Sequence, residues 1–162
     1  MPYTMTPDGA DKLEIMLRNM GEKAHSIAAQ GLYDGAGVMA DEIQRQAQAI
    51  ATKPFHYTVF GTREPSPEEK SAVTGAGVGI AKFEKSGSNA QTSVGYSKAG
   101  YADVAGKIKP IPKIANAINS GTSFMRKQPF FRKAVNNGKG RATQAICDRI
   151  EEEYNKLTQS GG

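Results

Sequence analysis

Residues 119–135, Asn-Ser-Gly-Thr-Ser-Phe-Met-Arg-Lys-Gln-Pro-Phe-Phe-Arg-Lys-Ala-Val, join a turn, a group of large apolar side chains and the start of a long helix. Gly121, Thr122 and Ser123 are typical of a turn, because glycine adopts positive φ readily and hydroxyl groups can bond the nearby backbone. Pro129 suits the first turn of a helix, since its φ is preset and no N–H is needed there. The stretch therefore predicts a turn followed directly by a helix.

The predicted final helix runs from about Pro129 to Gln159, and its apolar stripe consists of Val135, Ile146, Ile150 and Leu157. Four large apolar side chains crowd its start: Phe124, Met125, Phe130 and Phe131. Each fully buried ring contributes about 1.5–3 kcal/mol. We therefore expect this stretch to fix how the last helix docks, with a kink in the glycine-containing segment 137–140.

Two helices are predicted before it. The first begins at Thr6-Pro7-Asp8, which offers a capping hydroxyl, a proline and an acid, and it ends or bends at Gly21. The second runs from about Glu22 to Ala51. Its glycines between Gly31 and Gly37 mean either a break or the close approach of another backbone, and we expect a continuous but weakened helix.

The middle of the chain predicts short strands, because apolar residues alternate there. The expected strands are Tyr57–Phe60, Gly75–Lys85 and Thr92–Tyr96. The sequence also predicts a surface loop at Glu64–Glu69 with a short helix capped by Ser66, an irregular segment at 100–112, and a short helix at Ile111–Asn119 stopped by Gly121. The expected fold is α+β, with a long N-terminal helix and a C-terminal helix packed on a small curved antiparallel sheet.

Length and composition indicate one domain. The 162 residues match one domain of ordinary size, with frayed ends expected at 1–5 and 159–162. A single cysteine, Cys147, excludes an internal disulfide. No apolar run resembles a signal peptide or reaches the length needed to span a bilayer, so we expect a soluble protein made in the cytoplasm.

Positive charge is concentrated in the second half of the chain. The segment 105–141 holds nine Lys or Arg and no Asp or Glu, within a chain of net charge +5. Such a block favours contact with phosphate or with an acidic partner, although solvated lysines that keep the protein soluble are an equal alternative. The candidate contact residues are Lys107, Lys109, Lys113, Arg126, Lys127 and Lys133.

No residue pattern predicts catalysis, a cofactor or a metal site. The glycines at 75–79 lack the third glycine and the following helix of a dinucleotide-binding loop. His25 and His56 have no Cys or His at ligand spacing, and we expect them on a helix surface and in a loop. Cys147 lies near the apolar stripe as a buried thiol, and Glu151–Glu153 form a solvated acidic face.

The opening stretch resembles the signature of phage tail-completion proteins, also called minor tail or head–tail joining proteins, of long-tailed double-stranded DNA phages and prophages. In that family an E-x-G-T-S turn precedes x-Q-P-F-[LIF]-R-x-A and the last helix. The matching residues here are Ser120, Gly121, Thr122, Ser123, Gln128, Pro129, Phe130, Phe131 at the variable apolar place, Arg132 and Ala134. Asn119 replaces the commoner acid or aromatic residue near the turn, Lys53–Tyr57 replaces a P-V-x-T-G-x-L segment, and Arg63–Ser71 looks like an insertion. Outside the motif, the similarity is in the order of elements.

The resemblance implies a structural virion-assembly subunit of the phage neck or tail end. Its partners would be its own copies in a ring, for which a hexamer is one candidate, and other neck or tail proteins, with DNA passing through the lumen. It would reside in the host cytoplasm during assembly and afterwards in the virion. The alternative is a stand-alone basic nucleic-acid-binding module, with Tyr96, Tyr101 and Phe124 as aromatic candidates. An enzyme ranks last.

Overall fold

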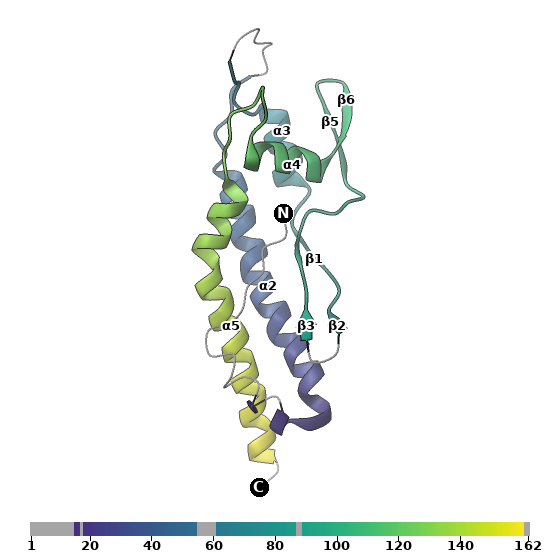
Figure 1. Ribbon diagram of the computed structural model, residues 1–162, viewed down its shortest axis with the longest axis vertical. Coiled ribbons are helices and arrows are strands. Elements are labelled where there is room, and N and C mark those ends of the chain that lie inside the picture. Colours follow the sequence, from purple (N-terminus) through teal and green to yellow (C-terminus); the bar gives the residue numbers. More distant parts are fainter. Residues whose placement is uncertain (1–14, 17, 55–60, 87–88, 161–162) are drawn as a thin grey trace. The chain divides into compact units, whose positions relative to one another are not determined.

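The computed structural model describes residues 15–16, 18–54, 61–86 and 89–160 (Figure 1). The elements, in chain order, are the 3-10 turn η1 (Gly21–Lys23), α2 (Ala24–Gln48), α3 (Pro67–Gly75), β1 (Gly79–Ile80), β2 (Glu84–Ser86), β3 (Asn89–Gln91), β4 (Val94–Gly95), β5 (Tyr101–Val104), β6 (Lys107–Pro110), α4 (Ile111–Ser120) and α5 (Phe130–Ser160). Long helices α2 and α5 and short antiparallel ladders make this an α+β protein, as the sequence predicted.

The described chain divides into two compact units. The first contains residues 40–54, 61–79 and 95–137, and the second contains residues 15–39, 80–94 and 138–160. Each long helix contributes residues to both units, and each unit is described in turn. The single domain expected from the length stays a prediction.

In the second unit, α2 and α5 pack at unusually short range. A Cβ placed on Gly35 would lie 2.6 Å from Ile146 Cγ1 and 3.0 Å from the carbonyl oxygen of Ala142, and one on Gly31 would lie 3.2 Å from Ile150 Cγ1. Gly31 and Gly35 are therefore needed for the approach of α5. Of the two alternatives posed by these glycines, close backbone packing is the correct one, and α2 is continuous as expected.

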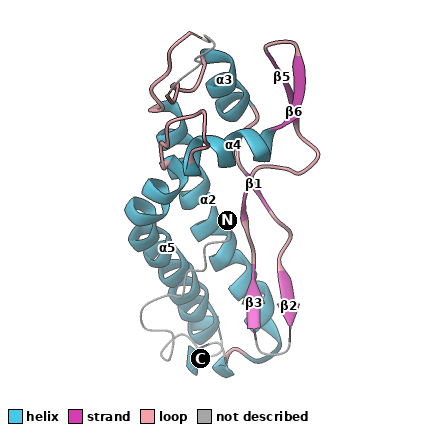
Figure 2. Cartoon of the chain, turned by 45° about the horizontal axis from the view of Figure 1, so that its top comes forward, coloured by secondary structure: helices cyan, strands magenta, loops and turns pink. Residues whose placement is uncertain are grey.

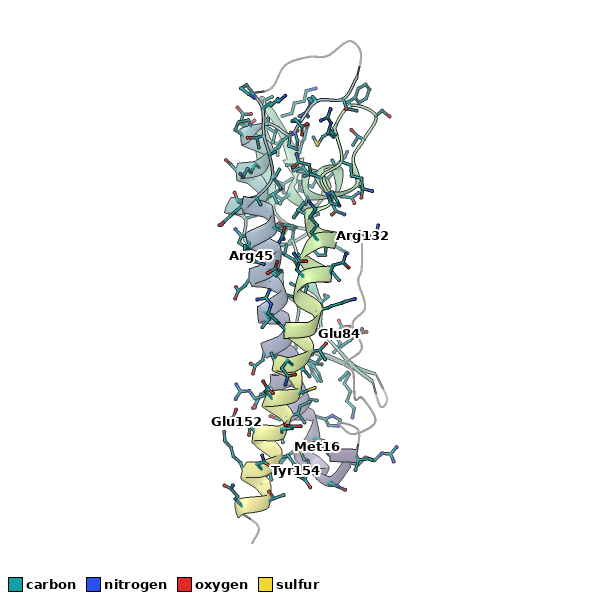
Figure 3. The ribbon with its side chains drawn as sticks, turned by 90° about the vertical axis from the view of Figure 1, so that its left-hand side faces the viewer. Met16, Arg45, Glu84, Arg132, Glu152 and Tyr154 are labelled. Atoms are coloured by element: carbon teal, nitrogen blue, oxygen red, sulfur yellow. The ribbon has the colours of Figure 1, made fainter. Side chains whose placement is uncertain are left out.

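The second unit has a core of Met20, Ile27, Ile146 and Ile150. Met16, Cys147, Tyr154 and Leu157 pack around it half-buried, and Figure 3 labels Met16 and Tyr154 near the same end of α5. A helical segment that includes Ile15 and Asn19 ends before Gly21, whose φ is +60°, as predicted. The expected start of this helix at Thr6 lies outside the described residues.

The first unit contains α3, which begins with a capping box. Ser66 Oγ accepts from the backbone N–H of Glu69 at 3.2 Å, and Glu69 Oε2 accepts from the N–H of Ser66 at 2.8 Å. The cap predicted at Ser66 is thus confirmed. The surface position predicted for this segment is wrong for Pro65, Ser66 and Glu69, which are buried, and right for Pro67 and Glu68, which are exposed. The helix continues to Gly75.

The strands are shorter and more separate than predicted (Figure 2). They form three two-stranded ladders, β1–β4, β2–β3 and β5–β6, rather than one sheet. Within the strand expected over Gly75–Lys85, only β1 and the start of β2 form. Gly75 itself is the last residue of α3. Of the strand expected at Thr92–Tyr96, only β4 forms. The strand expected at Tyr57–Phe60 lies outside the described residues.

The irregular segment predicted at 100–112 is wrong, since β5 and β6 form an antiparallel hairpin there. The two residues that connect them, Ala105 and Gly106, have φ of 52° and 76°, which is the positive-φ pattern of a two-residue hairpin turn. Glycine satisfies this at one position, but alanine rarely adopts it. The turn is held by Glu68, whose Oε2 accepts from the N–H of Ala105 at 3.0 Å.

Helices α4 and α5 agree with the sequence. α4 buries Ile111, Ile114 and Ile118 and carries a proline in its first turn. α5 starts one residue after Pro129, and the predicted kink segment 137–140 lies inside one uninterrupted helix. The core of the first unit includes Ile43, Ala47, Ile50, Val73, Val104, Ile111, Ile114, Ile118, Met125, Phe130 and Ala134.

Candidate functional site

The motif begins where α4 ends, at Gly121. Its φ is +77°, and an added Cβ would lie 3.0 Å from Lys127 Cβ and 3.2 Å from Lys127 Cα and N. Both the backbone conformation and the crowding therefore exclude larger residues there. The N–H of Gly121 still donates to the carbonyl of Ala117 at 2.8 Å, so the chain leaves the helix without an unpaired donor.

A hydroxyl-stabilised turn follows. Thr122 Oγ1 accepts from the N–H groups of Phe124 at 3.2 Å and Met125 at 3.0 Å, and the N–H of Thr122 donates to the carbonyl of Met125 at 3.0 Å. Ser123 lies exposed in the middle of this turn. The turn expected at these residues is confirmed, with Thr122 as the residue that organises it.

The turn is tied to a distant part of the chain by a parallel bridge between Arg63 and Met125. The N–H of Arg63 donates to the carbonyl of Phe124, and the N–H of Arg126 donates to the carbonyl of Arg63, each at 2.8 Å. Met125 is buried, whereas the ring of Phe124 is 71% exposed. Phe124 therefore does not crowd the start of α5 as predicted, because the bridge turns its side chain to solvent.

Gln128 locks the same segment from its other end. Its side-chain Oε1 accepts from the N–H of Ala51 at 2.9 Å, and its Nε2 donates to the carbonyl of Ala51 at 2.8 Å and to Glu64 at 3.0 Å. Its backbone N–H donates to the carbonyl of Ile118 at 2.8 Å. One glutamine thus joins the segment that follows α2 and the last turns of α4 to the segment before α5.

Asn119 caps α5. Its Oδ1 accepts from the N–H groups of Phe131 at 3.1 Å and Arg132 at 3.4 Å. The first N–H groups of a helix have no acceptor within the helix itself, and a side chain that supplies one is a cap. Phe130 is 3% exposed and meets the ring of Phe131 edge-on with centroids 6.3 Å apart. The residue that departs from the family motif therefore has a structural role: it accepts hydrogen bonds without a charge.

A buried ion pair supports the bridge. Arg63 makes two hydrogen bonds with Glu69, of 2.7 and 2.8 Å, with their side chains only 14% and 3% exposed. Burial acts to raise the pKa of Glu69, but bonds from Arg63 and the Ser66 N–H and the charges of Arg63 and Lys109 outweigh it. The pKa of Glu69 therefore lies below its ordinary value of 4.5, and Glu69 is ionised at neutral pH.

The six predicted contact cations come from several elements of the first unit. Lys107 and Lys109 lie on β6, Lys113 on α4, Arg126 and Lys127 in the connecting segment, and Lys133 in the first turn of α5. All are exposed except Lys109, which is half-buried, and Arg126 pairs with Glu64 at 3.0 Å. The described part of this unit holds twelve Lys or Arg and six Asp or Glu, an excess of six positive charges.

Two of the cations of α5 occupy places that do not stabilise the helix. Arg132 and Lys133 lie in the first turn, at the positive end of the helix dipole, where acids stabilise a helix and cations do not. Figure 3 shows Arg132 near the start of α5 and Glu152 near its end. This order of charges is unfavourable within the helix.

The aromatic candidates for nucleic-acid stacking differ in exposure. Tyr101 and Phe124 are exposed, at 60% and 71%. Tyr96 is half-buried, and its hydroxyl is buried without a hydrogen-bond partner among the described residues. Burial raises the pKa of Tyr96 above its usual range. Because Tyr96 is half-buried, it is a weaker candidate for base stacking than the two exposed rings.

The histidines and the cysteine are the remaining residues considered for chemistry. His25 is exposed on α2, with its Nε2 2.6 Å from Lys85 Nζ, and Cys147 is half-buried rather than buried. His56 lies outside the described residues. Searching the described ranges finds no group of three or more His, Cys, Asp or Glu arranged to hold a metal ion. Nor does any helix within these ranges have the length and apolarity to cross a membrane.

The site is thus a structural joint in which side chains bind backbone groups, and it carries exposed cations and an exposed ring. The sequence indicated the turn and the helix start, but not the partners of Gln128 and Asn119 or the pair Arg63–Glu69. No family model matches the chain, and neither a curated protein nor a solved structure is significantly similar to it.

Proposed function

We propose that this protein is a structural virion-assembly subunit of the neck or tail end of a long-tailed phage, acting as a tail-completion or head–tail joining protein in a ring. The proposal comes from the motif that Ser120–Ala134 shares with that family. One observation carries it: the matched polar residue Gln128 binds both backbone groups of Ala51 through its side chain and the carbonyl of Ile118 in α4 through its N–H, which is the role expected of a scaffold motif.

The distribution of charge supports assembly on a negative partner. The first unit has an excess of six positive charges, and most of its cations are exposed. Complementary charges between subunits or toward DNA phosphates would set orientation and association rate more than affinity. In this function the protein works in the host cytoplasm and then in the virion, and it converts no substrate.

The experiment is sedimentation velocity of the purified chain alone and with the tail-tube protein of the same phage, followed by electron microscopy. Rings, or salt-sensitive binding to the tube, are the expected result. A chain that remains a monomer and does not bind the tube at any salt concentration would refute the proposal.

A stand-alone nucleic-acid-binding module is the second candidate, favoured by the exposed rings of Tyr101 and Phe124 beside exposed cations. Base stacking contributes about 1–3 kcal/mol per ring, and phosphate contacts make the affinity strongly salt-dependent. Fluorescence anisotropy with single-stranded DNA at rising salt tests this candidate. Absence of binding, or binding that salt does not weaken, would remove it.

A further inference from the structure

The first unit has two patches with exposed large apolar side chains. The hairpin patch consists of Tyr101, Asp103, Ile108 and Pro110. The loop patch consists of Phe124, Arg126 and Lys127. The ring of Phe124 is 71% exposed and Ile108 is 75% exposed, so no described part of the chain covers either side chain. Large apolar side chains exposed together mark interaction surfaces more often than single scattered ones do.

The register of the hairpin places the hairpin patch on one face. Tyr101 pairs with Pro110 and Asp103 pairs with Ile108, and directly paired residues point to the same side of an antiparallel ladder. On the opposite face, Val104 is 2% exposed and belongs to the core. A two-stranded ladder is marginally stable by itself, so an uncovered apolar face is a place where another chain can complete it.

The loop patch is rigid although it is exposed. The backbone of Phe124 bonds through its N–H to Thr122 and through its carbonyl to Arg63. Its ring is therefore presented on a fixed support. An aromatic side chain held in this way loses little conformational freedom on binding, which is the property of an interface anchor.

The two patches have opposite charge. The carboxylate-bearing Asp103 and the ammonium-bearing Lys127 are both exposed. An apolar patch with a carboxylate thus complements an apolar patch with cations, and both belong to the same sequence. This complementarity identifies the occupant as a second copy of the chain rather than an unrelated protein.

The patches also lie at opposite ends of one element. The hairpin ends at Pro110, where α4 begins, and the loop patch follows Gly121, where α4 ends. α4 has 10 residues and is therefore about 15 Å long. In Figures 1 and 2 the hairpin and the segment leading to α5 leave α4 at opposite ends. Contact between two different patches is heterologous and builds rings or filaments.

We propose that the hairpin patch of one copy binds the loop patch of the next, with Phe124 against Tyr101 and Ile108 and with Lys127 facing Asp103. This inference deepens the proposed function and rests on it for the setting, because it names the contact that would close the ring.

The first test uses sedimentation equilibrium of the full-length chain up to about 1 mM, the weak end of specific association. Phe124→Ser and Ile108→Ser should each weaken self-association about 30-fold, as loss of an interface anchor does. Ile15→Ser is the matched control, since Ile15 is 60% exposed in the second unit, and it should leave the dissociation constant unchanged. Circular dichroism checks that each variant folds.

The second test exchanges the charges. Asp103→Lys and Lys127→Glu should each weaken association about tenfold, and the double variant should recover most of the loss. If the chain forms rings whose stability none of these variants changes, this inference is wrong and the proposed function stands. If the chain binds the tail tube but does not self-associate, this inference is also wrong and the proposed function also stands. Failure to bind either would overturn both. Loss of DNA binding in Phe124→Ser with unchanged self-association would assign the loop patch to nucleic acid and also overturn the inference.

Discussion

The contact between α2 and α5 predicts opposite effects for the same substitution two residues apart. Gly→Ala in a helix interior gains about 1 kcal/mol from helix propensity where space allows. An added Cβ at Gly37 meets nothing within 4 Å, so Gly37→Ala should stabilise the protein by about that amount. At Gly35 the new methyl group would lie 2.6 Å from Ile146 Cγ1 and 3.0 Å from the Ala142 carbonyl oxygen.

Ile146 cannot yield easily, because it is 5% exposed and a β-branched residue in a helix has essentially one rotamer. Overpacking of this kind costs about 1–3 kcal/mol. The gain in helix propensity from Gly to Ala is about 1 kcal/mol, so the cost of overpacking outweighs it. Gly35→Ala should therefore be less stable than the wild type by about 1 kcal/mol, and less stable than Gly37→Ala by about 2 kcal/mol.

Urea unfolding followed by circular dichroism measures these differences, with the slope compared between variants. Ile146→Ala supplies a double-mutant check: with the large side chain removed, Gly35→Ala should cost much less, because only the contact with the Ala142 carbonyl oxygen remains. The close approach would be refuted if Gly35→Ala were as stable as Gly37→Ala, or if its effect were the same in the Ile146→Ala background.

Three further predictions concern the first unit. Because the folded pKa of Glu69 is lowered, its contribution to stability is present above pH 4.5 and is lost as pH falls through the folded value. Acid titration of unfolding should show this loss in the wild type and not in Glu69→Gln, which should itself lose about 3 kcal/mol by removing the carboxylate that pairs with the half-buried Arg63. Asn119→Ala should lower stability by about 1 kcal/mol through loss of the α5 cap, while Asn119→Asp, which keeps the acceptor, should not, as thermal melts would reveal. Ala105→Gly should raise stability by about 1 kcal/mol in urea unfolding by removing a side chain from a positive-φ position, and a loss would contradict the turn geometry.

Local patterns predicted the helices well. α4 was predictable because three isoleucines recur at helical spacing between a proline and a positive-φ glycine. The β5–β6 hairpin was missed because Ala105 occupies a turn position that sequence normally marks with Asn or Gly. The extent of the strands was overestimated, because the sequence predicted one long strand over Gly75–Lys85. In the structure Gly75 belongs to α3, and only β1 and the start of β2 form within this range.

The candidate site was predictable only where its chemistry is local. Gly121 and Thr122 act on their own neighbours in sequence, so their roles followed from residue type. Gln128 binds Ala51, 77 residues away, and no local pattern records such a partner. The exposure of Phe124 was hidden for the same reason, because it depends on the bridge to Arg63.

The double attachment made by Gln128 and Met125 has a consequence for how this chain can vary. Ala51 is held by Gln128, and Arg63 is held beside Met125, so both ends of the intervening stretch are fastened within one short segment. The entropy of closing a loop grows only slowly with length, by about 0.6 kcal/mol for each doubling. A change of a few residues between these two fixed points should therefore alter the stability of the joint only slightly.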